Sequence, residues 1–337
     1  AVDNTSVGYA SLLLNTTGIN NVGIGKDALY ANTTASNNTA VGYRSLYDNT
    51  TGAQNTAFGR LALANNTTAS ENVAMGSASL LQNTTGASNT ALGSGSLYYN
   101  TNGSNNTAVG YQSLYDNTTG AQNVALGMFA LANNTTANYN TAVGYAAMEA
   151  TTGQYNTAVG GSAMYSNTTG YENTAVGTEA LENNTTGTRN TALGKEALES
   201  NTTAVNNTAI GFQAGLGITT GGYNVTVGSE SMMATMTGTD NAACGYGAMQ
   251  VNTTGSHNTA MGNRALFDNT TGSSNTAVGR TALGDNTTGD ANTAIGRLAM
   301  EHNTTGSSNT AVGYRSQSEG ATGAGNVSVG RDTLRYN

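Results

Sequence analysis

The stretch NTAVGYRSLYDNTTGAQ, residues 38–54, is followed directly by NTAFGRLALANNTTASE and returns almost unchanged further on as NTAVGYQSLYDNTTGAQ. With the first Asn of each stretch taken as position 1, repeats begin every 17 residues from Asn4 to Asn326, and one 16-residue repeat occupies 140–155. A short fixed period of this kind is typical of a solenoid, in which each repeat forms one turn, or rung. We therefore interpret residues 1–337 as a single repeat array.

The pattern inside the repeat predicts β-strands. Position 4 is apolar throughout, and position 2 is Thr or Val in all repeats but one. Side chains alternate between the two faces of a strand, so positions 2 and 4 share a face, and the exchange of Thr with Val predicts that this face is buried. The only cysteine, Cys244, also occupies position 4 and is expected to be a small core residue. The predicted core includes Val7, Ile24, Val41, Val109, Val143, Val176, Val278 and Val312.

The opposite face of the strand carries only small residues. Position 3 is nearly always Ala, and position 5 is Gly in all twenty repeats. Such uniformity indicates either the close approach of another backbone or a dihedral angle that only Gly tolerates, and the first explanation would place another copy of the chain here. The glycines predicted at this tight contact include Gly42, Gly59, Gly110, Gly144 and Gly177.

Most repeats end in NTTG or NTTA, which predicts a turn into the next rung. The turn Asn is missing in GLGITTGG and MMATMTGT, so we expect a kink or a loosened turn in 212–240. Rungs in parallel register stack about 4.8 Å apart, and equivalent Asn and Thr side chains should hydrogen-bond from rung to rung. The predicted fold is an all-β, parallel β-solenoid (β-roll) of about twenty rungs. No capping element is visible at either end, so we expect a longer shaft or ends that meet in a filament.

Composition excludes several classes of partner. Only 9% of residues are charged, the net charge is −8, and the eleven Lys and Arg are scattered, so we expect no nucleic-acid binding. No apolar run is long enough to span a membrane, and a single cysteine cannot form an intrachain disulfide. Because 37% of residues are hydrophobic and recur at fixed positions, a packed core is expected rather than disorder.

Catalytic groups do not converge in this sequence. His257 and His302 occupy different repeat positions and are expected on the surface. Carboxylates such as Glu179 and Glu182 recur in successive repeats and could cleave glycosidic bonds if they flanked a cleft, as in a polysaccharide depolymerase, but a solvated ridge is the simpler interpretation. Zinc, calcium-loop and phosphate-loop signatures are lacking, so we expect no metal, no cofactor and no enzyme activity.

Binding surfaces are suggested by aromatic residues at positions 6 and 10. Rings on a repetitive surface could stack against sugars, or they could cover the edges of the core or an interchain groove. Candidates for glycan contact are Tyr43, Tyr47, Tyr111 and Tyr115. Stacked Thr residues also raise ice binding as an alternative, although the inward orientation predicted for position 2 argues against it.

The turn sequence N-T-T matches the acceptor for N-glycosylation. In a glycosylating secretory pathway it could carry a row of glycans, whereas the alternative is that Asn and Thr serve only as turn and ladder residues. Candidate acceptors include Asn15, Asn49, Asn117, Asn184 and Asn269.

The unit NTAVGYxSLxxNTTGxx resembles the head repeats of trimeric autotransporter adhesins and, more closely, the repeat arrays of phage-type tail-fibre proteins. The resemblance implies a left-handed parallel β-roll with three chains side by side about one axis. It also implies that Val41 and its equivalents line the roll and that Gly42 and its equivalents lie at the tight contact. By this likeness the chain is a fibre or adhesin shaft, outside a cell or on a virion, that forms homotrimers or end-to-end filaments and touches cell-surface glycans.

Overall fold

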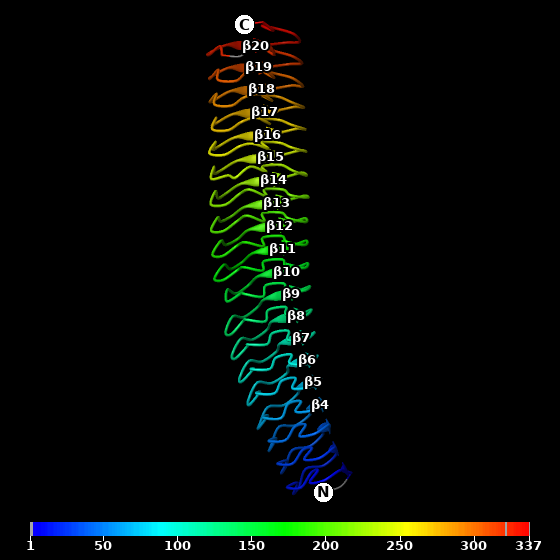
Figure 1. Cartoon of the computed structure of the whole chain (residues 1–337). Helices are drawn as coiled ribbons and strands as arrows, with labels where there is room; N and C mark the ends of the chain where they lie inside the picture. Colours follow the sequence, from blue (N-terminus) through cyan, green and yellow to red (C-terminus); the bar gives the residue numbers. More distant parts are fainter. Residues whose placement is uncertain (1–2, 321, 337) are drawn as a thin grey trace. The chain divides into compact units, whose positions relative to one another are not determined.

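One short strand opens each repeat. The computed structural model describes residues 3–320 and 322–336, in which there are twenty strands and no helix. The chain divides into two compact units, unit 1 (Ala1–Thr169) and unit 2 (Gly170–Asn337). Unit 1 is drawn from blue to green and unit 2 from green to red in Figure 1.

Unit 1 is a parallel β-solenoid in which consecutive strands pair in chain order. Its strands are β1 (Thr5–Val7), β2 (Val22–Ile24), β3 (Thr39–Val41), β4 (Thr56–Phe58), β5 (Val73–Met75), β6 (Thr90–Leu92), β7 (Thr107–Val109), β8 (Val124–Leu126), β9 (Thr141–Val143) and β10 (Thr157–Val159). Each residue pairs with the one 17 positions later, as Thr39 does with Thr56. The 16-residue repeat keeps this register, because Thr141 pairs with Thr157.

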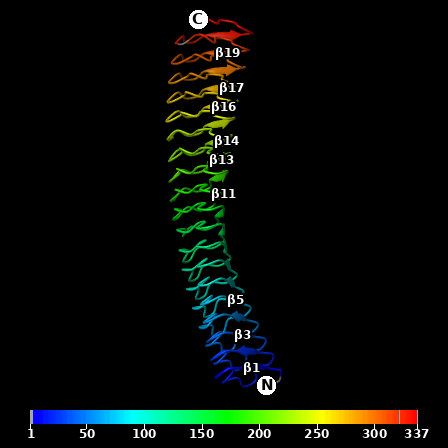
Figure 2. The ribbon, with the colours of Figure 1, turned by 45° about the vertical axis from the view of Figure 1, so that its right-hand side comes forward.

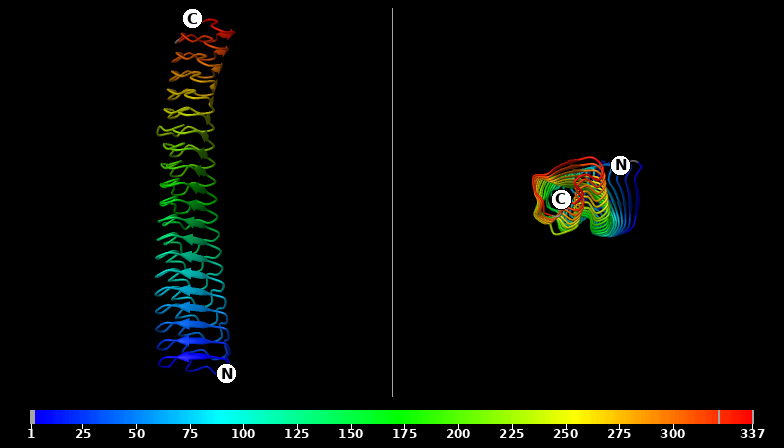
Figure 3. Two further views of the ribbon diagram at one scale, coloured as in Figure 1. Left: turned by 90° about the vertical axis from the view of Figure 1, so that its right-hand side faces the viewer. Right: turned by 90° about the horizontal axis from the view of Figure 1, so that it is seen from above.

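Unit 2 repeats the same arrangement. Its strands are β11 (Thr174–Val176), β12 (Thr191–Leu193), β13 (Thr208–Ile210), β14 (Val225–Val227), β15 (Ala242–Cys244), β16 (Thr259–Met261), β17 (Thr276–Val278), β18 (Thr293–Ile295), β19 (Thr310–Val312) and β20 (Val327–Val329). All pairings are parallel and in the 17-residue register, for example Thr191 with Thr208. Figures 2 and 3 show one turn of chain for every strand within each unit. The predicted fold class is therefore confirmed.

The interior of each rung lies on the side of the strand opposite to the predicted one. Ala108 at position 3 is fully buried, together with the Ser and Leu of positions 8 and 9, Ser113 and Leu114. Position 4 points outward: Val7, Ile24 and Val176 are exposed. The other predicted core residues are half-buried at the surface: Val41, Val109, Val143, Val278 and Val312. Cys244 is exposed as well.

The physical reason is the narrow cross-section of a 17-residue turn. Its interior is filled by one Leu or Met, two small residues and two Asn side chains in each rung, which leaves no room for position 4 residues that range from Val to Phe58. The exchange of Thr with Val reflects a half-exposed sheet surface, on which both β-branched residues are favoured.

The glycines of position 5 are required by the chain's own next rung. Gly42 has a φ of 135°, and a Cβ there would lie 2.4 Å from the carbonyl oxygen of Gly59. Gly59, Gly110, Gly144 and Gly177 meet the following rung in the same way, at 2.4–2.6 Å. The tight contact is thus confirmed, but the neighbour is the same chain, so these glycines give no support to a second copy packed on this face.

Candidate functional site

Two ladders of asparagine run through the interior. At position 1, Asn106 Oδ1 accepts from the backbone N–H of Asn123 at 3.0 Å, and its Nδ2 donates to Gly120 O at 2.8 Å. At position 12, Asn117 Nδ2 donates to Asn100 Oδ1 at 2.7 Å and to the same Gly120 O at 2.9 Å. The predicted rung-to-rung pairing of asparagine is therefore present, and it satisfies amides that are fully buried.

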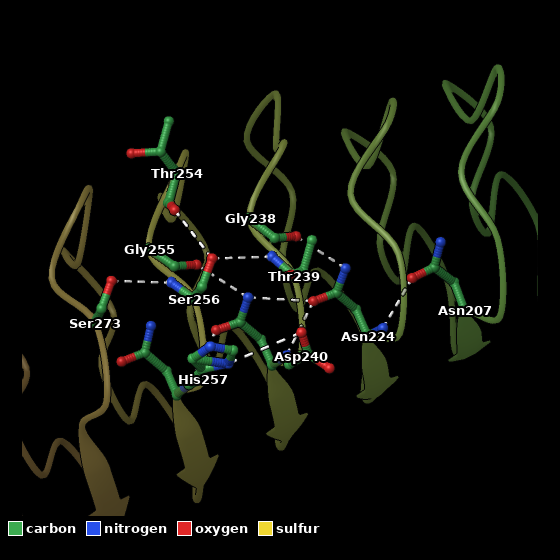
Figure 4. Close-up of polar contacts among 12 residues, drawn as sticks. Asn207, Asn224, Gly238, Thr239, Asp240, Thr254, Gly255, Ser256, His257 and Ser273 are labelled. Carbon is green, nitrogen blue, oxygen red and sulfur yellow. Dashed lines mark hydrogen bonds and ion pairs between the residues drawn. The ribbon is translucent and has the colours of Figure 1, made fainter.

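The same arrangement occurs in unit 2 (Figure 4). Asn207 Oδ1 accepts from the backbone of Asn224 at 2.9 Å, and Asn224 Nδ2 donates to Gly238 O at 3.0 Å. Nearer the surface, Ser256 Oγ accepts from the backbone N–H of Thr239 at 3.1 Å. Equivalent polar groups thus hold successive rungs in register from the core to the surface.

These ladders bear on the two interpretations of the N-T-T turn. Asn49, Asn117, Asn184 and Asn269 are fully buried. The Nδ2 atom that would receive a glycan donates instead to the carbonyl of position 15, at 2.9 Å in both Asn49 and Asn269. Asn15, which is half-buried, donates in the same way to Gly18. These contacts favour a structural role for the turn Asn, since four of the five candidate amides are fully buried in the folded chain.

The position-12 ladder is interrupted where the sequence departs from NTT. The Oδ1 atoms of Asn134, Asn201 and Asn303 have no hydrogen-bond partner within the described residues. In the rung that follows each of them, the position of Asn is taken by Thr151, Ile218 and Gly320, respectively. The sequence pattern indicated two of these places, the 16-residue repeat from its length and the region 212–240 from its missing turn Asn.

The outward side of the strands forms what we call the outer sheet face, made by positions 2 and 4 of β1–β10 in unit 1 and of β11–β20 in unit 2. Neither position carries a charged residue in any repeat. Large apolar side chains are exposed on it, among them Phe58 at 54% and Met75 at 45% in unit 1 and Met261 at 51% in unit 2. The outer sheet face of each unit thus combines uncharged Thr or Val side chains with exposed apolar side chains of position 4.

The four tyrosines predicted to contact glycans lie in two different surroundings. Tyr43 and Tyr111 are exposed at position 6, and Tyr47 and Tyr115 are half-buried at position 10. The guanidinium of Arg44 lies 5.4 Å from the ring centre of Tyr43 and 5.0 Å from that of Tyr47, so it occupies the space between them. Tyr111 and Tyr115 instead border an open notch of about 210 Å³.

Of the carboxylates considered for catalysis, Glu179 and Glu182 lie on one rung of unit 2, and the equivalent Glu196 and Glu199 lie on the next rung. Burial and the charge of Glu179 raise the pKa of Glu182, whereas the hydrogen bond from Lys195 lowers the pKa of Glu196. His302 Nδ1 lies 2.6 Å from Asp285 Oδ2, a hydrogen bond that raises the pKa of the imidazole, and His257 lies 3.8 Å from Asp240. No group of three or more His, Cys, Asp or Glu in the described ranges could hold a metal ion.

The free energy of unfolding should decrease as pH rises. Burial is the main cause that raises the pKa of six carboxyl groups, Asp48, Asp116, Glu149, Glu182, Glu199 and Asp268. A group whose pKa is raised in the folded state contributes stability that is fully present below its unfolded-state pKa. This stability is lost as pH rises through the folded-state pKa. His302 also has a raised pKa, so it changes stability in the same direction, at higher pH. We expect the free energy of unfolding to fall modestly as pH rises from below 4 to about 8, since the loss begins near the ordinary pKa of 3.8 or 4.5 for the carboxyl groups and of 6.5 for His302. The effect is small because these groups are partly solvated.

Denaturant unfolding at a series of pH values checks this prediction. The double variant Asp116→Asn/Glu149→Gln removes two of the raised carboxyls and should flatten the dependence. A free energy of unfolding that rises from pH 5 to pH 8 would contradict it.

The fold and the 17-residue unit define the chain as a parallel β-solenoid repeat protein. No family model matches the chain. A search of curated proteins likewise finds no match. Among the described residues there is no helix long and apolar enough to cross a membrane.

Proposed function

We propose that the chain is a structural, non-enzymatic element of an extracellular or virion fibre, in which the outer sheet face packs against further copies of the same chain. The observation that carries this proposal is the exposure of large apolar side chains on that face, rung after rung. The stacked strands and buried Asn ladders support a load-bearing role, because many parallel hydrogen bonds share a force applied along the stack. The location outside a cell rests on the resemblance of the repeat to those of tail fibres and adhesins.

A second copy of the chain is the occupant that fits the outer sheet face best. Although the chain carries a net charge of −8, positions 2 and 4 are uncharged, so two such faces meet without repulsion across the contact. Within a unit, every rung presents this face in the same register. A contact that two copies make at one rung can therefore be repeated at the rungs before and after it, because the rungs of both copies have the same spacing of about 4.8 Å.

Charges placed on the outer sheet face should break this association. In the variant Val176→Lys/Ile210→Lys, two exposed position-4 residues of unit 2 become lysines that lose hydration when the face is covered. We expect the wild-type chain to form trimers or larger assemblies at micromolar concentration, and the variant to associate at least about tenfold more weakly. Sedimentation equilibrium measures both.

The matched control is Thr178→Lys/Phe212→Lys, which places the same charges two residues further along the same rungs, at position 6. It should associate like the wild-type chain. A wild-type chain that sediments as a single copy, or equal weakening in both variants, would contradict the proposal.

Ice binding is a second candidate function. The sequence argued against it because position 2 was predicted to point inward, and the structure does not have that orientation. Position 2 carries Thr in fourteen repeats, and these residues lie on the outer sheet face, not in the interior. Against it, position 4 varies from Val41 to Phe58 and Met75, so the surface is uneven at the scale of an ice lattice. Thermal hysteresis of the purified chain decides between the two, since self-association alone produces none.

A further inference from the structure

A notch interrupts the row of side chains at positions 6 and 7 of unit 1. Gly95 has no side chain, and the residues beside it, Ser77, Ala78 and Ser94, are small. The resulting cavity has a volume of about 210 Å³, and its lining residues come from four successive rungs, those of β4 to β7. It lies beside the outer sheet face and uses none of the side chains of positions 2 and 4.

Aromatic and polar side chains surround this space. Tyr98 and Tyr115 form one wall, with ring centres 5.2 Å apart and planes inclined at 28°. Tyr111 borders the notch and is 49% exposed. Its ring meets that of Phe129 edge to face, at 5.7 Å, so Phe129 steadies it without stacking on it. The ring of Tyr111 is thus held in place beside an open space.

Polar groups complete the lining. Gln112 and Arg60 both border the cavity, together with the serine hydroxyls. The side chain of Gln112 can donate and accept, and the guanidinium of Arg60 can only donate. The notch therefore combines an exposed aromatic ring with side chains that can donate hydrogen bonds and side chains that can accept them.

We propose that this notch binds the ring of a neutral pyranose sugar. A pyranose has an apolar C–H face, which suits the ring of Tyr111, and a rim of hydroxyl groups, which suits Gln112, Arg60 and the serines. A wholly apolar ligand would leave these polar groups unpaired. A phosphate or sulfate would meet one cation, Arg60, on a chain of net charge −8.

The equivalent tyrosines four rungs earlier show why the notch is specific to this place. Tyr43 and Tyr47 stand at the same repeat positions as Tyr111 and Tyr115, but Arg44 at position 7 lies over both rings. In the rung of Tyr111 and Tyr115, position 7 is Gln112, and in the rung before it position 7 is Gly95, so no arginine occupies position 7 beside these rings. Arg44 also shows that the backbone accepts arginine at this position, since its φ of 50° is close to the 68° of Gly95.

Binding can be measured with methyl glycosides and short oligosaccharides of glucose, galactose and N-acetylglucosamine, by saturation-transfer NMR and calorimetry on the full chain. We expect a dissociation constant in the millimolar range for one sugar ring, as is usual for a shallow site. Gly95→Arg places a long side chain in the notch from the rung before Tyr111, and Tyr111→Ser introduces the residue that position 6 already carries at Ser77 and Ser94. Each variant should weaken binding at least about tenfold.

The matched control is Tyr43→Ser, which removes the same ring at the same repeat position from the row that Arg44 covers; it should bind like the wild-type chain. Circular dichroism establishes that the variants are folded. The proposal is overturned if none of the neutral sugars binds at ten-millimolar concentration, or if the only sugar that binds is a charged one, galacturonate. It is also overturned if Tyr43→Ser lowers affinity as much as Tyr111→Ser. Self-association has a separate readout, so the two proposals can fail independently.

Discussion

Alanine in place of Gly144 should lower the free energy of unfolding by at least about 3 kcal/mol. Gly144 has a φ of 136°, a conformation that residues with a Cβ rarely adopt, and the new Cβ would lie 2.5 Å from the carbonyl oxygen of Gly160. Backbone atoms of the next rung cannot move aside, because Thr141 and Val143 of the same strand pair with β10. Denaturant unfolding followed by circular dichroism measures the loss.

The matched control is Gly161→Ala. Gly161 directly follows Gly160, its φ lies outside the left-handed region, and a Cβ there would meet no described atom within 4 Å. We expect a change within about 0.5 kcal/mol, or slight stabilisation from the loss of backbone freedom in the unfolded chain. Equal losses at Gly144 and Gly161 would show that the rung spacing is not as tight as described.

The second large effect is expected from Asn117→Ala. This change removes two buried hydrogen bonds. One runs from Asn117 Nδ2 to Asn100 Oδ1 at 2.7 Å, and the other from Asn134 Nδ2 to Asn117 Oδ1 at 3.0 Å. It also leaves a cavity in the core. An unsatisfied buried polar group costs about 1–3 kcal/mol, to which the cavity adds. We therefore expect a loss of about 3 kcal/mol in the free energy of unfolding.

Thr119→Ala is the control for this prediction, because Thr119 stands two residues later in the same turn and is exposed. It should change the free energy of unfolding by no more than about 0.5 kcal/mol. If Asn117→Ala proves as mild as Thr119→Ala, the buried ladder does not contribute to stability and the structural explanation of the NTT turn fails.

The period of the sequence was enough to predict the fold but not which side of the strand is inside. Alternation shows that Ala108 lies on one face and Thr107 with Val109 on the other. The exchange of Thr with Val at position 2, beside the apolar residue of position 4, then favoured the face of Thr107 and Val109 as core. In so narrow a rung that interpretation fails, because Leu114 and two asparagines already fill the interior beside Ala108.

The candidate sites were predicted only in part, for related reasons. The sequon of Asn117 is a local pattern, and its burial depends on Asn100 and Asn134 in neighbouring rungs, which a local pattern does not report. The notch depends on a departure from the repeat. The small residues at positions 6 and 7 of two successive repeats, Ser77-Ala78 and Ser94-Gly95, would have pointed to it, because small side chains beside larger rings leave an opening.

The common register of the rungs has a consequence for how such a gene can change. Each strand pairs only with its predecessor and its successor in the same unit, always through the same atoms of the repeat. Recombination that adds or drops a whole repeat therefore rejoins surfaces that already match. Copy number can vary without a change in the fold, and a change of another length is accommodated where it leaves the strand pairing intact, as in the 16-residue repeat.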